Sequence, residues 1–205
     1  MFIKICGITH IDDARLAVEL GANALGFIFA PSKRQVTAKH AADIISMLPA
    51  QVEKVGVFVD ESRERIIEIA ETAGLSCLQL HGSESRYLCT ELGKQYKVLK
   101  SVKIDPSGTV LSPTDFPVWK LLLDTHLPKL AGGTGMTFPW ERLQEFDTEN
   151  VIVAGGLSPD NISALINNYQ PFGVDVNSGV ESSPGQKDPA KLIELFRIIR
   201  AQDHH

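Results

Sequence analysis

The chain opens with Phe2-Ile3-Lys4-Ile5-Cys6-Gly7, the stretch on which the interpretation of the whole sequence depends. An apolar run that ends in a Cys-Gly pair is typical of a short buried strand leading into a loop. Alternate residues of a strand share a face, so Lys4 and Cys6 point the same way, roughly 6.6 Å apart. A buried charge is costly unless it is paired or used. Taken alone, Cys6 is more typical of a small buried hydrophobe, and the rest of the chain reverses that preference.

The composition is that of an ordinary globular protein. At 205 residues, with no linker rich in Pro, Gly or Ser, the chain is expected to form a single domain over residues 1–205. No apolar run approaches the roughly 20 residues that a membrane span needs. The first residues lack the basic and apolar pattern of an export signal, so we expect none. We therefore expect a cytoplasmic protein that binds no membrane.

Charge and cysteine content narrow the class of partner. The net charge is −5 and no stripe of Lys and Arg is present, so the sequence carries no electrostatic footprint for nucleic acid. Cys6, Cys77 and Cys89 are odd in number and lack the spacing of metal ligands. This predicts free thiols, with no disulfide framework and no zinc site.

Strand-like and helix-like segments alternate along the chain. The strand-like runs lie at residues 2–7, 24–30, 54–60, 77–82, 97–104, 119–124, 151–156 and 173–179. Helical patterns lie at residues 11–20, 37–48, 62–73 and 84–92, then from Pro139, from Pro159 and from Asp188 to about Ala201. Thr9 and Ser158 are expected to cap two of these helices. Residues 105–117 contain three prolines and a glycine, which predict an irregular crossover instead of a helix.

Eight strands rich in Val, Ile and Leu, alternating with seven helices, favour a parallel sheet that is covered on both faces. The economical closure is an α/β fold of the (β/α)8 TIM-barrel type, with an irregular crossover in place of helix five. An open doubly wound sheet is the alternative. Against it, the first strand-loop junction lacks a Gly-rich dinucleotide fingerprint.

In such barrels the active site lies at the carboxyl ends of the strands. The sequence places there Cys6, Arg34, Asp60, His81, Asp124, Gly155, Gly156, Asp175, Asn177, Ser178 and Gly179. Across the mouth, Cys6 and Asp124 would form a base and acid pair, a thiolate that abstracts a proton and a carboxyl group that donates one. The alternative for Asp124 is a structural ion pair, with Lys4 as a candidate partner.

The other strand-end residues suit binding. Gly155 and Gly156, with Ser178 and Gly179, occupy the position where barrels commonly hold a phosphate on backbone amides, although paired glycines are also common in plain turns. Arg34 offers a fork for a planar carboxylate, whereas a single loop arginine is more often a solvated surface charge. His81 suits either substrate orientation or a bond to a loop carbonyl, and the structural role is preferred. The histidines show no ligand spacing, so no metal is expected.

Eight motifs, in order along almost the whole chain, resemble the phosphoribosylanthranilate isomerase family of tryptophan biosynthesis. They are KICGIT at 4–9, GFIF at 26–29 with PSKR at 31–34, VGVFV at 55–59, LQLHG at 78–82, LLDT at 122–125, GGTG at 132–135, AGGL at 154–157 and GVDVNSGVE at 173–181. The family also lacks a regular fifth helix, which agrees with the proline-rich crossover.

The resemblance implies a reaction and a set of roles. The reaction is the Amadori rearrangement of N-(5'-phosphoribosyl)anthranilate to 1-(2-carboxyphenylamino)-1-deoxyribulose 5-phosphate, without a cofactor. Cys6 matches the general base, Asp124 the general acid and Arg34 the residue that receives the anthranilate carboxylate, while the two glycine turns match the phosphate site. His81 and Asp175 are assigned to substrate binding. The expected partner is a phosphosugar substrate, and the expected state is a monomer or homodimer.

Some residues depart from the family pattern, and other functions compete. Met136 and Pro139 stand where Lys and Asp are common, and Gln35 where an aromatic residue is common. A related aminoaldose isomerase of histidine biosynthesis typically has a carboxylate base in place of Cys6. A class-I aldolase would need a lysine where Asp124 stands. A non-catalytic phosphosugar-binding barrel would need no proton-transfer pair.

Overall fold

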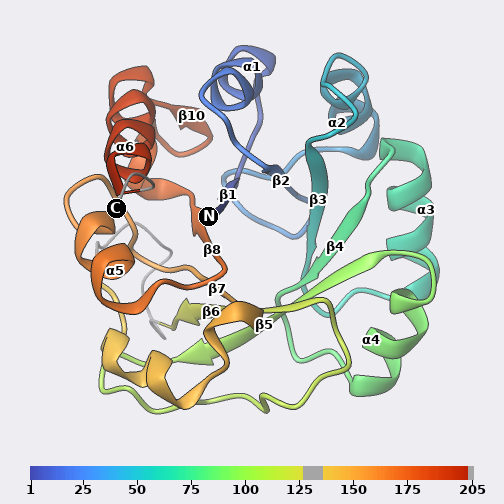
Figure 1. Ribbon diagram of the computed structural model, residues 1–205. Coiled ribbons are helices and arrows are strands. Elements are labelled where there is room, and N and C mark those ends of the chain that lie inside the picture. The colour runs from blue at the N-terminus through green and yellow to red at the C-terminus, as the bar shows by residue number, and fades with distance from the viewer. Residues whose placement is uncertain (127–135, 203–205) are drawn as a thin grey trace.

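The computed structural model describes residues 1–126 and 136–202, and its eight main strands form a closed parallel barrel (Figure 1). The strands are β1 Phe2–Ile5, β2 Ala24–Ile28, β3 Glu53–Phe58, β4 Cys77–Leu80, β5 Lys97–Ile104, β6 Lys120–Thr125, β7 Val151–Val153 and β8 Gly173–Val176. Each strand pairs with the next, and β8 pairs with β1 to close the barrel. The predicted TIM-barrel class is confirmed, and the open doubly wound sheet is wrong.

Helices surround the barrel in Figure 1. They are α1 Ile11–Glu19, α2 Ala38–Ile45, α3 Arg63–Ala73, α4 Arg86–Gly93, α5 Ile162–Tyr169 and α6 Pro189–Gln202. Ser62 and Ser85 cap α3 and α4 by accepting a backbone N–H three residues on. Between β5 and β6 the chain, yellow-green at the bottom of Figure 1, carries no helix. The predicted irregular crossover is confirmed.

The first helix cap was predicted wrongly. The residue before α1 in the cap position is His10, whose side chain makes no capping bond. Thr9 instead donates its hydroxyl hydrogen to the carbonyl oxygen of Gly185, far along the chain. A tertiary partner has therefore replaced the local one.

Two later helices also differ from the prediction. After Pro139 the chain forms only short 3-10 turns, η1 Trp140–Glu145 and η2 Thr148–Asn150. Leu143 is the one fully buried residue of these turns, which leaves too little apolar area to stabilise an α-helix. The next helix, α5, begins at Ile162 rather than near Pro159, because Asn161 accepts the N–H of Ser158 and braces the preceding turn.

After a short helical turn, the structure adds a hairpin that the sequence did not predict. After β8 come the 3-10 turn η3 Ser178–Val180 and an antiparallel hairpin, β9 Glu181–Ser183 with β10 Gln186–Lys187. The Thr9 bond to Gly185 joins the tip of this hairpin to the loop after β1. The hairpin therefore lies beside the carboxyl ends of the barrel strands.

The barrel interior changes character along its axis. At the amino end the rings of Phe2, Trp119 and Phe172 pack together, with centroids 5.5 to 5.8 Å apart. The next layer is apolar and buried, and consists of Ala24, Val55, Cys77, Leu99, Leu122, Ile152 and Ala154. Toward the carboxyl end the buried residues become polar, namely Lys4, Gln79, Ser101 and Asp175. The apolar end closes the barrel, and the polar end is left for chemistry.

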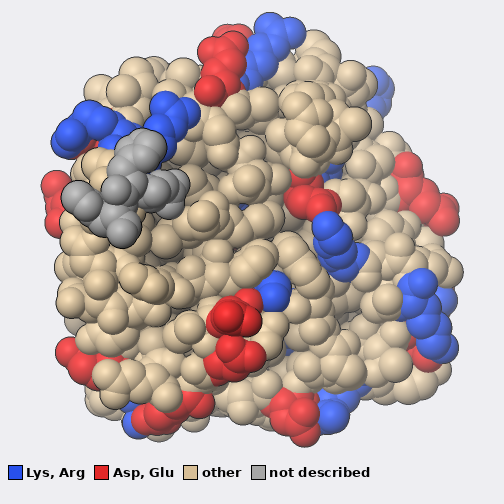
Figure 2. All heavy atoms as spheres, in the orientation of Figure 1, with Lys and Arg blue, Asp and Glu red and all other residues tan. Residues whose placement is uncertain are grey.

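The surface carries no strong field of one sign on the face drawn in Figure 2. There, positive and negative side chains are interspersed over a largely uncharged surface. No helix within residues 1–126 and 136–202 is long and apolar enough to span a membrane.

The apolar layer predicts where the barrel is most sensitive to truncation. Leu122 is fully buried there, so Leu122→Ala should lower the free energy of unfolding by about 2–5 kcal/mol through lost burial and the cavity left behind. Ile193→Ala is the matched control, because Ile193 in α6 is 50% exposed and its truncation should cost much less. Urea unfolding followed by circular dichroism checks both, and equal losses for the two variants would contradict the layer's importance.

Candidate active site

A cavity of about 380 Å³ opens at the carboxyl ends of the strands. Most residues that the sequence placed at this end line it, namely Cys6, His81, Asp124, Gly155, Gly156, Asp175, Asn177 and Ser178. Arg34, Asp60 and Gly179 do not line it. The predicted base and acid therefore share one cavity, although their strands are not neighbours.

Cys6 follows β1 directly and is 5% exposed. Its N–H donates to the carbonyl oxygen of Val176, 2.9 Å away, which continues the pairing of β1 with β8. A β-carbon added to Gly26 would lie 2.6 Å from the Cys6 sulfur and 3.1 Å from Nζ of Lys4. Glycine at position 26 thus leaves room for the thiol and the ammonium group to occupy the same corner of the interior.

Lys4 forms a buried ion pair inside the barrel. Its Nζ lies 2.7 Å from Oδ2 of Asp175, and the two residues face each other in the register of β1 and β8. Burial lowers the pKa of Lys4, but the charges of Asp175 and Cys6 outweigh it, so the pKa lies above its ordinary value. Lys4 therefore stays charged, and it pairs with Asp175 rather than with Asp124.

The thiol of Cys6 is held largely in its neutral form. Burial raises the pKa of Cys6 most, Asp175 raises it further, and the cations Lys4 and Lys187 lower it without cancelling the effect of burial. Lys187 was not among the sequence candidates, because nothing local to β10 indicates that it comes near Cys6.

Asp124 is held by a chain of side chains from β4. Nε2 of His81 lies 3.1 Å from Oδ2 of Asp124, and Nδ1 of His81 lies 3.0 Å from Nε2 of Gln79. An amide nitrogen can only donate, so Nδ1 accepts and the ring proton sits on Nε2, where it points at Asp124. His81 thus bonds a catalytic candidate rather than the loop carbonyl that the sequence favoured. Gln79 was missed, although strand parity puts it on the face of His81.

Two buried oxygens in the lining of the cavity lack a hydrogen bond. Among the described residues, Oε1 of Gln79 and Oδ1 of Asp175 have no partner, and both residues line the cavity. A buried acceptor without a donor is costly. Both oxygens are therefore suited to accept hydroxyl hydrogens from a sugar-like ligand.

The turn after β7 presents backbone amides to the cavity. Gly155 and Gly156 have φ angles of +82° and +70°, which favour glycine. Within the described residues, neither N–H donates to another backbone group. Ser178 lines the same cavity, whereas Gly179 packs against the carbonyl of Leu157, where a β-carbon would collide. The turn and Ser178 suit an anion, and Gly179 instead permits close packing behind them.

Arg34 is not a solvated surface charge. Its side chain is only 16% exposed, and its guanidinium forms an ion pair with Glu181 of β9. Asp60 lies outside the cavity, where its carboxylate accepts the N–H of Ser83, 2.6 Å away, in the loop beyond His81. It therefore braces a loop instead of binding a ligand.

The family departures fall at the edge of the site. Gln35 donates to the carbonyl oxygen of Phe29, 2.8 Å away, so it fastens its own loop. Met136 lines the cavity and is 48% exposed, and Pro139 precedes η1. The motif at residues 132–135 lies outside the described residues.

The position of Lys4 predicts a measurable effect on Cys6. In Lys4→Met, loss of the cation and exposure of Cys6 to an unpaired Asp175 both raise the thiol pKa, so alkylation by iodoacetamide should shift to higher pH. Cys77 and Cys89 are fully buried, and burial raises the pKa of Cys77 to about 12, so mass spectrometry can follow Cys6 separately.

Lys54→Met is the matched control for this experiment. Lys54 is a buried lysine whose ammonium group bonds the carbonyl oxygens of Pro49 and Ala50 near the amino end of β3. Its loss should leave the alkylation profile unchanged. A Lys4→Met profile that matched the parent would reduce Lys4 to a structural partner of Asp175.

Comparison with known proteins adds an independent line of evidence. The family model of N-(5'-phosphoribosyl)anthranilate (PRA) isomerase matches residues 3–197. The N-(5'-phosphoribosyl)anthranilate isomerase of Desulforudis audaxviator is 45% identical over 201 residues, which cover 97% of each chain. The crystal structure of phosphoribosyl anthranilate isomerase from Thermus thermophilus superposes with a TM-score of 0.86 at 36% identity, covering 98% of this chain and 100% of that one.

A second solved structure agrees. Phosphoribosyl anthranilate isomerase from Thermotoga maritima gives a TM-score of 0.85 at 35% identity, covering 98% of this chain and 99% of that one. With the family model over nearly the full length and relatives well above 30% identity, the motifs, the barrel and the cavity lead to one conclusion: this chain belongs to the N-(5'-phosphoribosyl)anthranilate isomerase family.

Proposed function

We propose that this chain catalyses the Amadori rearrangement of N-(5'-phosphoribosyl)anthranilate to 1-(2-carboxyphenylamino)-1-deoxyribulose 5-phosphate in tryptophan biosynthesis. The observation that carries the proposal is that Cys6 and Asp124 line one cavity. The same cavity is lined by the Gly155–Gly156 turn, whose backbone amides suit an anion. A related structure at 33% identity was solved with the reduced form of this product bound, which supports a phosphosugar as the ligand.

In the proposed mechanism Asp124 acts first. Its carboxyl group gives a proton to the furanose ring oxygen, the C1'–O bond breaks, and the nitrogen lone pair forms a protonated imine. His81 donates from Nε2 to the carboxylate that remains, which stabilises the negative charge. Gln79 fixes the ring tautomer that makes this donation possible.

Cys6 acts second. As a thiolate it removes the C2' proton, and the C–H electrons flow into the protonated imine to give an enol-amine, which tautomerises to the ketone. The imine is its own electron sink, so the step needs no cofactor. Lys4 and Lys187 stabilise the thiolate while it forms.

The other groups in and beside the cavity bind substrate. The amides of Gly155 and Gly156, with Ser178, hold the phosphate. The unpartnered oxygens of Gln79 and Asp175 accept sugar hydroxyls. Arg34 receives the anthranilate carboxylate, because a guanidinium fork matches its planar geometry.

The first test is an assay of the reaction and of its two proton-transfer groups. Substrate fluorescence should fall when the purified chain is added, and it would stay flat with a non-catalytic binder. Cys6→Ser and Asp124→Asn should each lower kcat by at least roughly 100-fold with the fold intact, the usual scale for losing a general acid or base.

Cys89→Ser and Asp115→Asn are the matched controls. Cys89 is buried in α4 away from the cavity, and the Asp115 side chain is 87% exposed, so both variants should retain parental kcat. Near-normal turnover in Cys6→Ser or in Asp124→Asn would remove that residue from the mechanism.

The second test concerns Arg34. Because a carboxylate clamp binds ground state and transition state alike, Arg34→Met should raise KM more than it lowers kcat. Steady-state kinetics of the variant and the parent separate the two constants. An unchanged KM would leave Arg34 as a purely structural partner of Glu181.

The cellular setting and assembly are also proposals. Three free cysteines suit a reducing compartment, which supports a cytoplasmic location. We expect residues 1–205 to act as a single domain, as a monomer or homodimer, and a solved relative from Thermotoga maritima is described as dimeric, with monomers generated from it. Sedimentation equilibrium distinguishes the two states.

A further inference from the structure

We propose that Glu181 and Lys187, on the hairpin β9–β10, are positioning residues that hold Arg34 with two donors free for the substrate carboxylate. The inference rests on the proposed function, which supplies that carboxylate. It assigns a task in the reaction to the hairpin, which lies outside the eight barrel strands.

Glu181 grips one edge of the Arg34 guanidinium. Nε lies 2.9 and 3.1 Å from the two carboxylate oxygens, and Nη2 lies 2.6 Å from Oε2. These bonds use the Nε–H and one hydrogen of Nη2. Among the described residues Nη1 donates to nothing, so Nη1 and the second hydrogen of Nη2 remain as two parallel donors. That pair matches a second carboxylate, approached end-on.

Lys187 holds Glu181 in place from the other side. Its Nζ lies 3.1 Å from Oε1 of Glu181, and it also donates to both oxygens of Asn177, at 3.0 and 3.2 Å. The N–H of Gly185 reaches Oε1 as well, at 3.2 Å. With every donor coming from a different part of the loop or hairpin, the carboxylate has little freedom to turn.

The charges of this cluster do not balance by themselves. Arg34 and Lys187 bring positive charge, and Glu181 brings one negative charge. Burial lowers the pKa of Lys187, and the charge of Glu181 opposes that effect. Burial raises the pKa of Glu181, but the bonds from Arg34 and Lys187 outweigh it, so the pKa lies below its ordinary value and the residue stays ionised. A buried excess of positive charge favours a second anion at the unused edge of Arg34.

Arg34 is also placed close to the proposed base. A β-carbon on Gly7 would lie 2.9 Å from Cδ of Arg34 and 2.5 Å from Oδ1 of Asn177. The arginine stem therefore crosses directly over the residue after Cys6. Glycine at position 7, with a φ angle of +73°, is what allows this approach.

The experiment measures binding of the reduced product, 1-(o-carboxyphenylamino)-1-deoxyribulose 5-phosphate with its ketone reduced, by equilibrium titration. Glu181→Gln keeps the shape of the side chain but removes the charge that orients Arg34. Its Kd should rise by at least about 10-fold, the scale of losing a charge-assisted hydrogen bond. In kinetics the effect should appear in KM more than in kcat.

A double-mutant cycle separates positioning from general damage. In the Arg34→Met background, Glu181→Gln should cause no further rise in Kd, because the group that Glu181 holds is already absent. Glu181→Asp, which keeps the charge but shortens the reach, is the second variant if Glu181→Gln fails to fold, and it should also raise Kd. Thermal melts by circular dichroism confirm that each variant is folded.

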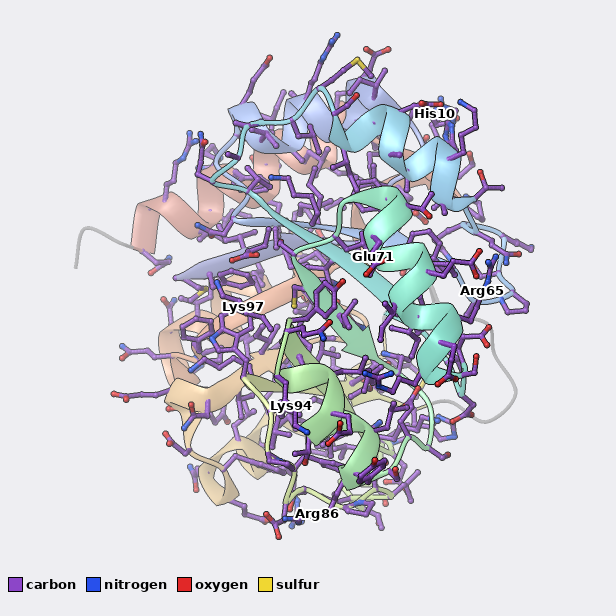
Figure 3. The ribbon with its side chains drawn as sticks, turned by 90° about the vertical axis from the view of Figure 1, so that its right-hand side faces the viewer. His10, Arg65, Glu71, Arg86, Lys94 and Lys97 are labelled. Atoms are coloured by element: carbon purple, nitrogen blue, oxygen red, sulfur yellow. The ribbon has the colours of Figure 1, made fainter. Side chains whose placement is uncertain are left out.

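Glu53→Gln is the matched control. Glu53 pairs with Lys97, which Figure 3 places toward the end of the barrel opposite His10 and Arg65. Removing this carboxylate also breaks a carboxylate–cation ion pair, but one away from the site, so the Kd should match that of the parent.

The outcomes separate the two claims. If the parent binds the reduced product and Glu181→Gln binds it equally well, or weakens it by the same factor with and without Arg34, the inference is overturned while the proposed function stands. If the parent does not bind it at all, the proposed function falls, and the inference falls with it.

Discussion

The ion pair between Lys4 and Asp175 is the interaction on which the site depends. A charged group cannot remain inside a barrel without a partner, and removing one member of a buried pair is far more costly than removing a surface charge. The pair joins β8 to β1, where the barrel closes. The contact that helps to close the barrel therefore also sets the charges at the candidate active site. Cys6 lies one layer nearer the mouth of the barrel, and the nearby cation Lys4 is held in place by this pairing of β1 with β8.

The barrel divides its stability and its chemistry between its two ends. Three packed aromatic rings and an apolar layer fill the amino end, and they supply burial without any polar requirement. At the carboxyl end, by contrast, buried acceptors of Gln79 and Asp175 have no partner among the described residues. Such groups are tolerated where a ligand completes them, which is consistent with the strand-end location of active sites in this fold.

Several side chains hold the proposed catalytic and binding groups in place. Gln79 orients His81, and His81 in turn meets Asp124. On the other side of the mouth, Lys187 fixes Glu181, and Glu181 fixes Arg34. Both arrangements are chains of hydrogen bonds, 2.6 to 3.1 Å long. Each proposed catalytic or binding group is therefore oriented in the absence of substrate, which is how a site limits the entropy lost on binding.

The sequence by itself determined the fold class and most of the strand-end residues. Strand periodicity and the proline-rich crossover are local patterns, and parity within one strand was enough to put Lys4 and Cys6 on one face. Those features depend on neighbours in the chain, so they can be inferred without a structure. The residues that line the cavity followed once the barrel was inferred, because its strands all end at the same face.

Only the tertiary structure decided which side chains pair with one another. Asp175 lies 171 residues from Lys4, and Glu181 lies 147 residues from Arg34, and no local pattern pairs residues at such separations. The same cause explains the wrong predictions: Thr9 bonds Gly185 instead of capping α1, and the segment after Pro139 buries too little to become an α-helix. Helix propensity is local and contributes little free energy per residue. A distant contact that contributes more free energy therefore overrides it.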